Sequence, residues 1–363
     1  ATLRKANQFA AWLSHVRERP VEVVEETKRA VPLKFWCADV NIGLKAPVEF
    51  AKEMQRTNRN AEPARKGKHD RGARHRPARS VPTTHHDVFD LVADNDLFPY
   101  LYFCFSRKNV ENFARSLGQR IGDGLLNKLE RREMTARLDS FAHTDSGHAL
   151  EPDIRRIYER GIAFHHAGLH VQLKALVEEL YEAKLIKVLY CTSTFALGIN
   201  MPARTACFDG LRKYDGRSLR PLTTREFMQK AGRAGRRGMD SVGHVVIRTD
   251  AVEWQWTERS LATYLRGEPE PVRSSFALSF NSIVNLLERS GKEHIKKVVQ
   301  KSFLAFTTSG DVRKLETEAA AMAEQQDWRS QKDAFKLARR AEKASEKVLE
   351  GVETRISFLQ QIG

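Results

Sequence analysis

A glycine-spaced cluster of arginines carries the clearest chemistry in this sequence. The segment Gln229-Lys-Ala-Gly232-Arg-Ala-Gly235-Arg-Arg-Gly238 places three arginines within one turn. Like charges this close repel one another unless they face a polyanion or acidic partners, and the planar guanidinium suits bidentate contact with phosphate oxygens. The glycines would let backbone and ligand approach closely. The segment therefore indicates a phosphate-binding turn, in which an arginine would stabilise charge that develops at a γ-phosphate.

Polar and cationic residues also follow two apolar runs that read as strands. Ser106 and Arg107 come after the first run, and Thr192 and Thr194 come after the second. Ligands of open α/β folds bind at the carboxyl ends of the strands. Hydroxyls and free backbone amides at such ends bind nucleic-acid phosphates well. These four residues would therefore suit a phosphate-bearing ligand at this edge of the sheet.

Histidines and cysteines could indicate a metal site, but their spacing does not favour one. His165 and His166 are adjacent, and neither a carboxylate nor a third ligand lies at ligand spacing from them. A structural or backbone-contacting role is the expected one. The chain has four cysteines, none in a C-x-x-C pair, so neither a zinc site nor a disulfide framework is expected.

Apolar runs and helical spacing alternate along most of the chain. The pattern predicts an α/β fold with a parallel sheet covered by helices on both faces, because strands buried on both faces read as continuous apolar runs. Strands are expected to stop beyond residue 266. The predicted strands are 20–25, 31–40, 100–105, 161–164, 185–191, 205–208 and 244–247, and the predicted helices are 7–16, 110–117, 171–181, one capped by Ser279, 293–303 and 312–347.

Residues 52–79 differ in character from the rest of the chain. Ten arginines and lysines are interleaved there with Gly, Pro and Asn, and large apolar side chains are almost absent. Such a segment buries too little surface to offset its ordering entropy, so we expect a flexible insertion. An auxiliary polyanion-binding arm and a merely solvated insertion are both compatible with this composition.

The arginine cluster resembles motif VI of superfamily-two helicases, Q-x-x-G-R-x-G-R, and its continuation through Asp240 is similar to the superkiller-type DExH branch. The resemblance implies that Arg233 and Arg236 are arginine fingers. It also implies that Gln229 contacts nucleotide or relays the state of the interface. We expect both guanidiniums to lie at the ligand edge of the sheet, facing a triphosphate bound by a neighbouring lobe rather than acidic groups of their own domain.

Three further segments resemble the same family in order and spacing. Residues 103–108 are similar to motif IV, residues 161–169 to the conserved segment after it, and residues 191–202 to motif V. The resemblance implies that Ser106, Arg107, Thr192 and Thr194 contact the nucleic-acid strand. It implies further that four residues approach the nucleotide or couple the two sites: Gly198, Asn200, Gly232 and Gly235.

The resemblance also implies a domain plan. Residues 1–30 are similar to the end of motif III and a linker that leaves the first RecA-like domain, and residues 31–265 to the second RecA-like domain, with the basic insertion at about 52–80. Residues 266–311 resemble the start of a mostly α winged-helix domain. Residues 312–347 would be a helical stalk inserted in it, and residues 348–363 its truncated continuation.

Two motifs of the family are missing from the sequence. We find no G-x-x-x-x-G-K-[ST] phosphate loop and no D-E-x-H segment, which would hold the phosphates of ATP and the Mg²⁺ ion. In this family both lie upstream of motif III. The Mg²⁺ ligands are therefore expected in the first RecA-like domain, and this chain by itself is expected to hydrolyse ATP only at background rate.

The resemblance implies an ATP-dependent 3′–5′ RNA helicase that binds single-stranded nucleic acid, RNA in preference to DNA, within an RNA-processing complex. The net charge of +15 agrees with a polyanionic partner. No apolar stretch suits a membrane span, so we expect a cytoplasmic protein, or a nuclear one in a eukaryote. A DNA helicase of the same superfamily and a non-catalytic binding or scaffold module remain as alternatives.

Overall fold

The computed structural model describes most of the chain. The described residues are 4–26, 28–60, 81–142, 150–193, 195, 201–250, 253–267, 269–272, 274, 279, 283–285, 288, 295, 297–324, 331–343, 354 and 357. The chain divides into two compact units, which we describe separately. The sheet unit comprises residues 1–2 and 26–270, and the helical unit comprises residues 3–25 and 271–363.

The sheet unit alternates strands with helices, as the sequence predicts. Its strands are β1 (Leu33–Asp39), β2 (Gly43–Lys45), β3 (Tyr100–Phe103), β4 (Ile162–His165), β5 (Val188–Cys191), β6 (Thr205–Phe208), β7 (Arg212–Tyr214), β8 (Leu219–Pro221) and β9 (Gly243–Arg248). Its helices are α2 (Pro47–Asn60), α3 (His85–Asp94), α4 (Arg107–Arg120), α5 (Lys128–Ala142), α6 (Pro152–Glu159), α7 (Val171–Glu182), α9 (Thr224–Ala231) and α10 (Trp254–Leu265).

Seven strands form one sheet in the order β2-β1-β9-β6-β3-β5-β4, while β7 and β8 pair separately as an antiparallel hairpin. Only β2 is antiparallel within the sheet; the other neighbours are parallel. Every residue of β3, β4, β5 and β6 is buried, which explains why these strands are apolar without alternation. The predicted α/β class with a parallel sheet is confirmed.

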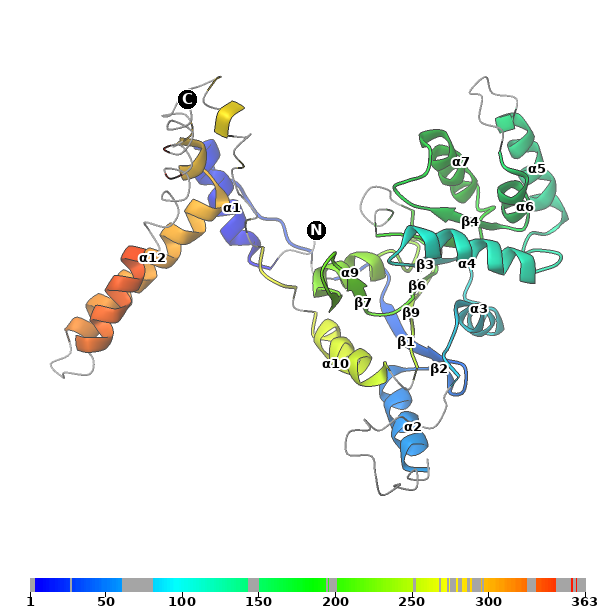
Figure 1. Cartoon of the computed structure of the whole chain (residues 1–363), viewed down its shortest axis with the longest axis horizontal. Helices are drawn as coiled ribbons and strands as arrows, with labels where there is room; N and C mark the ends of the chain where they lie inside the picture. Colours follow the sequence, from blue (N-terminus) through cyan, green and yellow to red (C-terminus); the bar gives the residue numbers. More distant parts are fainter. Residues whose placement is uncertain are drawn as a thin grey trace. The chain divides into compact units, whose positions relative to one another are not determined.

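Aromatic contacts show that helices cover both faces of the sheet. On one face Tyr190 of β5 meets His85 of α3 and Phe113 of α4. On the opposite face Phe208 of β6 packs on Phe227 of α9, with ring centroids 4.9 Å apart. In Figure 1, α9 and α10 accordingly lie on one side of β6 and β9, and α3 lies on the other. The arrangement fits a RecA-like domain.

Two predictions, one for residues 20–25 and one for residues 52–60, need correction. Residues 20–25 form no strand, because none of the described strands pairs with their backbone. Residues 52–60 belong to helix α2, so the first part of the basic segment is helical. Phe50 and Met54 anchor this helix in the core, and Phe50 packs on Trp254 of α10. The remainder of the segment, residues 61–80, lies outside the described residues.

The helical unit is built from two segments that lie near opposite ends of the sequence. Helix α1 (Ala6–Arg17) packs on α12 (Phe303–Ala323) through the rings of Phe9, Trp12 and Phe303, whose centroids lie 5.2–5.6 Å apart. The indole N–H of Trp12 also donates to the carbonyl of Lys301 at 2.9 Å. Residues 3–25 therefore fold with residues 271–363 in this structure.

The C-terminal predictions are met in part. Helix α12 begins nine residues before the predicted stalk at 312, with Ser302 as its N-cap, and residues 331–343 are helical as well. The amide of Ile283 donates to the carbonyl of Ser279 at 3.0 Å, and residues 297–300 are helical. The winged-helix arrangement stays a prediction. Among the described helices, none combines the length and the apolar character that crossing a bilayer requires.

Candidate functional site

The segment that links α9 to β9, residues 232–240, holds the predicted phosphate-binding arginines; we call it the arginine turn. A capping box of Thr223 and Glu226 starts α9, and Gly232 ends it. Gln229 lies within α9 and is half-buried. Since the helix is short and capped at both ends, the arginine turn leaves it at a defined point of the backbone.

Backbone contacts hold the arginine turn against the amino ends of the strands. The amide of Gly235 donates to the carbonyl of Ala203 at 2.8 Å, and the amide of Ala203 donates to the carbonyl of Arg233 at 2.9 Å. Ala203 lies two residues before β6. A Cβ on Gly243, the first residue of β9, would come within 2.6 Å of the backbone of Ala234 and Gly235. The turn therefore lies directly against the starts of β6 and β9.

The expected placement of the arginines at the ligand edge is wrong. Parallel strands all end at one edge of the sheet, and Arg233 and Arg236 lie at the opposite, amino edge, beside the starts of β6 and β9. The physical reason is connectivity: a helix that precedes a parallel strand must deliver the chain to that strand's amino end. The expectation had placed the proposed phosphate-binding arginines at the carboxyl edge, together with Ser106 and Thr192.

Arg236 also has an acidic partner in its own domain, contrary to expectation. Its Nε donates to Oδ2 of Asp240 and its Nη2 to Oδ1, both at 2.8 Å, and its backbone N–H donates to Oδ2 at 2.8 Å. The hydrogen bonds from Arg236 lower the pKa of Asp240, and those to Asp240 raise the pKa of Arg236. The i, i+4 spacing of Arg236 and Asp240 could have predicted this ion pair from the sequence.

The pair occupies only one edge of the guanidinium. The carboxylate of Asp240 accepts from the N–H of Nε and from one N–H of Nη2. It does not bind the other N–H of Nη2 or the two N–H groups of Nη1. The side chain of Arg236 is 21% exposed. Arg233 is half-buried, and desolvation lowers its pKa. The arginine turn thus presents two cations held by packing, one of them through a carboxylate.

Three of the residues predicted to contact nucleic acid, Ser106, Arg107 and Thr192, lie at the carboxyl edge, as expected. Ser106 and Arg107 follow β3 and are exposed. The hydroxyl of Ser106 accepts from the amide of Asn109 at 3.1 Å and so also caps α4. Thr192 follows β5, and its amide donates to the carbonyl of His165 at 3.2 Å. Because β3, β5 and β4 are neighbours, the sheet brings Ser106, Arg107 and Thr192 to one edge.

One segment leads from the carboxyl edge to the arginine turn. It leaves the carboxyl end of β5 at Thr192 and reaches the amino edge at Ala203, which bridges Ala234. Residues 194, 198 and 200 fall within this segment but lie outside the described residues, so the predictions for Thr194, Gly198 and Asn200 stay predictions. The segment from Thr192 to Ala203, twelve residues long, therefore connects the two edges.

Several curated proteins are similar to this chain, and two of the three that follow are helicases by name. The sequence is 32% identical over 328 residues to mRNA transport homolog 4 of Caenorhabditis elegans, and the match covers 87% of this chain and 31% of that protein. It is 31% identical over 316 residues to Exosome RNA helicase MTR4 of Homo sapiens, covering 84% and 30%. It is 37% identical over 224 residues to Antiviral helicase SKI2 of Saccharomyces cerevisiae, covering 60% and 17%.

The chain belongs to the superkiller-type DExH-box helicases. It spans about a third of the length of the first of these relatives. No family model matches the sequence.

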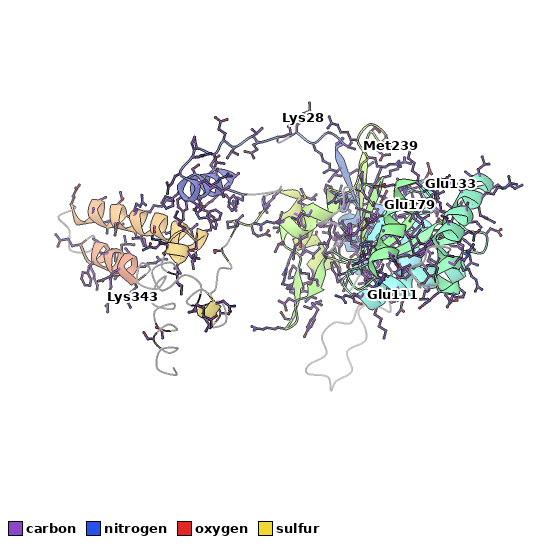
Figure 2. All side chains as sticks on the ribbon, turned by 90° about the horizontal axis from the view of Figure 1, so that it is seen from above. Lys28, Glu111, Glu133, Glu179, Met239 and Lys343 are labelled. Carbon is purple, nitrogen blue, oxygen red and sulfur yellow. The ribbon has the colours of Figure 1, made fainter. Side chains whose placement is uncertain are left out.

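The paired histidines of this helicase chain connect β4 to two helices. Nε2 of His166 lies 2.9 Å from Oε1 of Glu111 in α4, which is labelled in Figure 2. Nδ1 of His166 accepts a hydrogen bond from the amide of Gly168 at 3.1 Å. His165 contacts Glu178 of α7 at 3.3 Å, and burial lowers its pKa. These contacts support the structural role expected for both histidines. Within the described ranges, no three potential ligands gather into a metal site.

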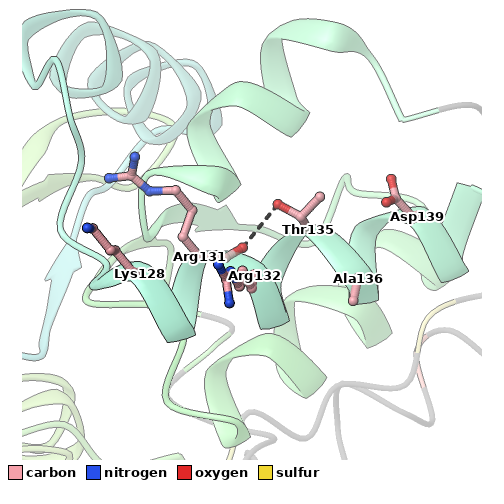
Figure 3. A pocket seen from close by; sticks show the side chains of 6 residues that line it. All are labelled: Lys128, Arg131, Arg132, Thr135, Ala136 and Asp139. Carbon is pink, nitrogen blue, oxygen red and sulfur yellow. Dashed lines mark hydrogen bonds between the residues drawn. The ribbon is translucent and has the colours of Figure 1, made fainter.

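A surface hollow of about 520 Å³ lies along α5 (Figure 3). It is shaped by one face of this helix, and the hydroxyl of Thr135 donates to the carbonyl of Arg131 within it at 3.0 Å. None of the predicted site residues takes part. Its lining residues are Lys128, Arg131, Arg132, Thr135, Ala136 and Asp139.

Proposed function

We propose that this chain forms the C-terminal part of the motor of an ATP-dependent RNA helicase, with the sheet unit as its second RecA-like domain. Relatives named as RNA helicases support the activity. The observation that carries the proposal is the arginine turn, which holds Arg236 by one guanidinium edge in a backbone pinned to β6 and β9. Rigid cations of this kind stabilise charge without reorganising during the reaction.

ATP would be bound between this domain and a neighbouring RecA-like domain. The neighbour would supply the phosphate loop and the Mg²⁺ ligands, since this sequence holds neither motif. Because the arginine turn lies at the amino edge, the proposal requires the neighbour's nucleotide to face the starts of β6 and β9 rather than the carboxyl edge. Arg233 and the unpaired edge of Arg236 would donate to the γ-phosphate, and Gln229, Gly232 and Gly235 would lie beside the nucleotide.

Single-stranded RNA would run along the carboxyl edge of the sheet. Ser106, Arg107, Thr192 and Thr194 would contact its phosphates, so the chain would show little sequence preference. The segment from residue 192 to residue 203 would couple this track to the arginine turn, because its two ends lie at the two sites. Loss of the γ-phosphate would then alter the grip on RNA, in steps directed 3′ to 5′.

The test is steady-state ATP hydrolysis by the full-length protein at saturating RNA. We expect Arg233→Ala and Arg236→Ala each to lower kcat by about 10³-fold while single-stranded RNA binding is retained. Arg132→Ala on α5 serves as a charge-matched control with unchanged turnover. Unchanged turnover in both arginine variants would instead indicate a scaffold. The 363-residue chain alone should hydrolyse ATP at background rate.

The substrate and the cellular setting follow the same proposal. Competition between RNA and DNA single strands of equal sequence, at one stated salt concentration, distinguishes an RNA helicase from a DNA helicase. One relative is named an exosome RNA helicase. We therefore propose that the protein works with an RNA-processing complex in the cytoplasm, or in the nucleus of a eukaryote.

A further inference from the structure

Arg29, which precedes β1, contacts the arginine turn although the two are far apart in the sequence. No role for Arg29 was predicted from the sequence. Its Nη2 donates to the carbonyls of Gly232 at 3.0 Å and Ala234 at 2.6 Å, and its Nε donates to the carbonyl of Val31 at 2.6 Å. Gly232 and Ala234 are the residues on either side of Arg233. One guanidinium therefore binds the backbone on both sides of a proposed arginine finger.

The chemistry of these contacts favours an arginine. The carbonyl of Gly232 lies at the C-terminal end of α9, where carbonyls lack helical partners and the helix dipole favours a cation. Although Arg29 as a whole is exposed, partial desolvation lowers its pKa, which indicates that its guanidinium lies against protein. Lysine carries three donors on one flexible point charge and would not reproduce the planar fork.

Arg29 and Ala203 hold the arginine turn from two different strands. The backbone of Ala203, before β6, donates to the carbonyl of Arg233 and accepts from the amide of Gly235. The guanidinium of Arg29, four residues before β1, donates to the carbonyls of Gly232 and Ala234. Each carbonyl from residue 232 to residue 234 thus has a partner outside the turn.

We propose that Arg29 is a positioning residue for Arg233 in ATP hydrolysis, an inference that rests on the proposed function. Arg29 does not touch the nucleotide; it sets the backbone from which Arg233 projects. A displacement of about 1 Å at a group that contacts the transition state can cost about 10²-fold in rate. Loss of Arg29 should therefore lower kcat and leave the KM for ATP much less affected.

The experiment uses the full-length protein and three variants. Arg29→Lys is expected to lower kcat of RNA-stimulated ATP hydrolysis by about 10- to 100-fold and to change the KM for ATP by less than about 3-fold. Combined with Arg233→Ala, it should cause no further loss, because both act through one side chain. Arg160→Lys is the matched control: Arg160 donates to the carbonyl of Gly118 within the same unit, far from the turn.

A second readout monitors the turn itself. In the 363-residue chain, Arg29→Lys and Arg29→Gln should each speed hydrogen exchange at the amides of Ala234 and Gly235, whereas Arg160→Lys should leave both unchanged. Wild-type kcat in Arg29→Lys, an additive loss with Arg233→Ala, or unaltered exchange in a folded Arg29 variant would overturn the inference. If Arg233→Ala alone retained full turnover, the proposed function would fail before the role of Arg29 was tested.

Discussion

Arg236 and Asp240 form a closed pair within one turn, with both carboxylate oxygens engaged by the guanidinium at 2.8 Å. The same carboxylate accepts the backbone N–H of Arg236, so the side chain and the backbone of this arginine are held together. A finger preset in this way loses less conformational freedom when it meets a phosphate. The pair thus makes Asp240 part of the proposed catalytic arrangement.

Asp240→Asn in the full-length protein should lower kcat for ATP hydrolysis by about tenfold, because an amide accepts through one oxygen only and its NH₂ group opposes the guanidinium. Since Arg236 lowers the pKa of Asp240, the pair is complete above the ordinary aspartate pKa and is lost as pH falls through the lowered value. Assays at neutral pH therefore measure the intact pair. Asp139→Asn, which removes a surface pair with Arg155, should leave kcat unchanged.

Gly235→Ala and Gly238→Ala separate packing from backbone strain. Both glycines have positive φ, +86° and +78°, so an alanine at either costs about 1 kcal/mol. A Cβ on Gly235 would also lie 2.6 Å from Cγ1 of Val31, whereas one on Gly238 meets nothing within 4 Å. We expect Gly235→Ala to cost about 2 kcal/mol more in the free energy of unfolding, measured by urea denaturation. Equal losses would contradict this packing.

Arg107→Ala should weaken RNA binding in a salt-dependent manner. Arg107 is exposed at the carboxyl edge, where its Nη1 lies 3.0 Å from the position of a Cβ on Gly168. Removal of one phosphate contact should reduce the slope of log K against log salt by about one and the affinity by about 3- to 10-fold at 0.1 M salt. Fluorescence anisotropy with labelled RNA measures both. The same change in Arg132→Ala would indicate general charge attraction instead.

His85 should make the stability of the sheet unit fall in mild acid. Its Nδ1 lies 3.0 Å from the hydroxyl of Tyr190, and burial lowers its pKa to about 3. Below an unfolded pKa near 6.5, the unfolded chain binds the proton that the folded state excludes. Stability is therefore complete above pH 6.5 and declines as pH falls toward 3.

The measurement is the melting temperature between pH 7 and pH 4.5. The His85→Gln variant should be less stable at pH 7 but should show a flatter dependence on pH, because its folded and unfolded states no longer differ in proton uptake at this position. Parallel curves for the two proteins would rule out His85 as the source of the acid sensitivity.

Much of the fold could be predicted because the relevant signals are local. The fully apolar runs at 100–103, 188–191 and 205–208 form buried parallel strands, and the cap at Ser106 starts a helix. The prediction failed at residues 20–25, which alternate like a strand but form no ladder with any described strand. It failed also at residues 52–60, whose charges hide the apolar contacts of Phe50 and Met54 that hold α2.

The sequence by itself determined which residues are candidates for binding phosphate, because residue type and short spacing decide the chemistry of Arg233, Arg236, Ser106 and Thr192. Only the tertiary structure decided where they lie. The starts of β1, β6 and β9 are brought together by parallel crossovers, which carry Arg29 and Ala203 to the arginine turn from about 200 and 30 residues away. Such contacts depend on strand order, and strand order is a property of the whole sheet rather than of any segment.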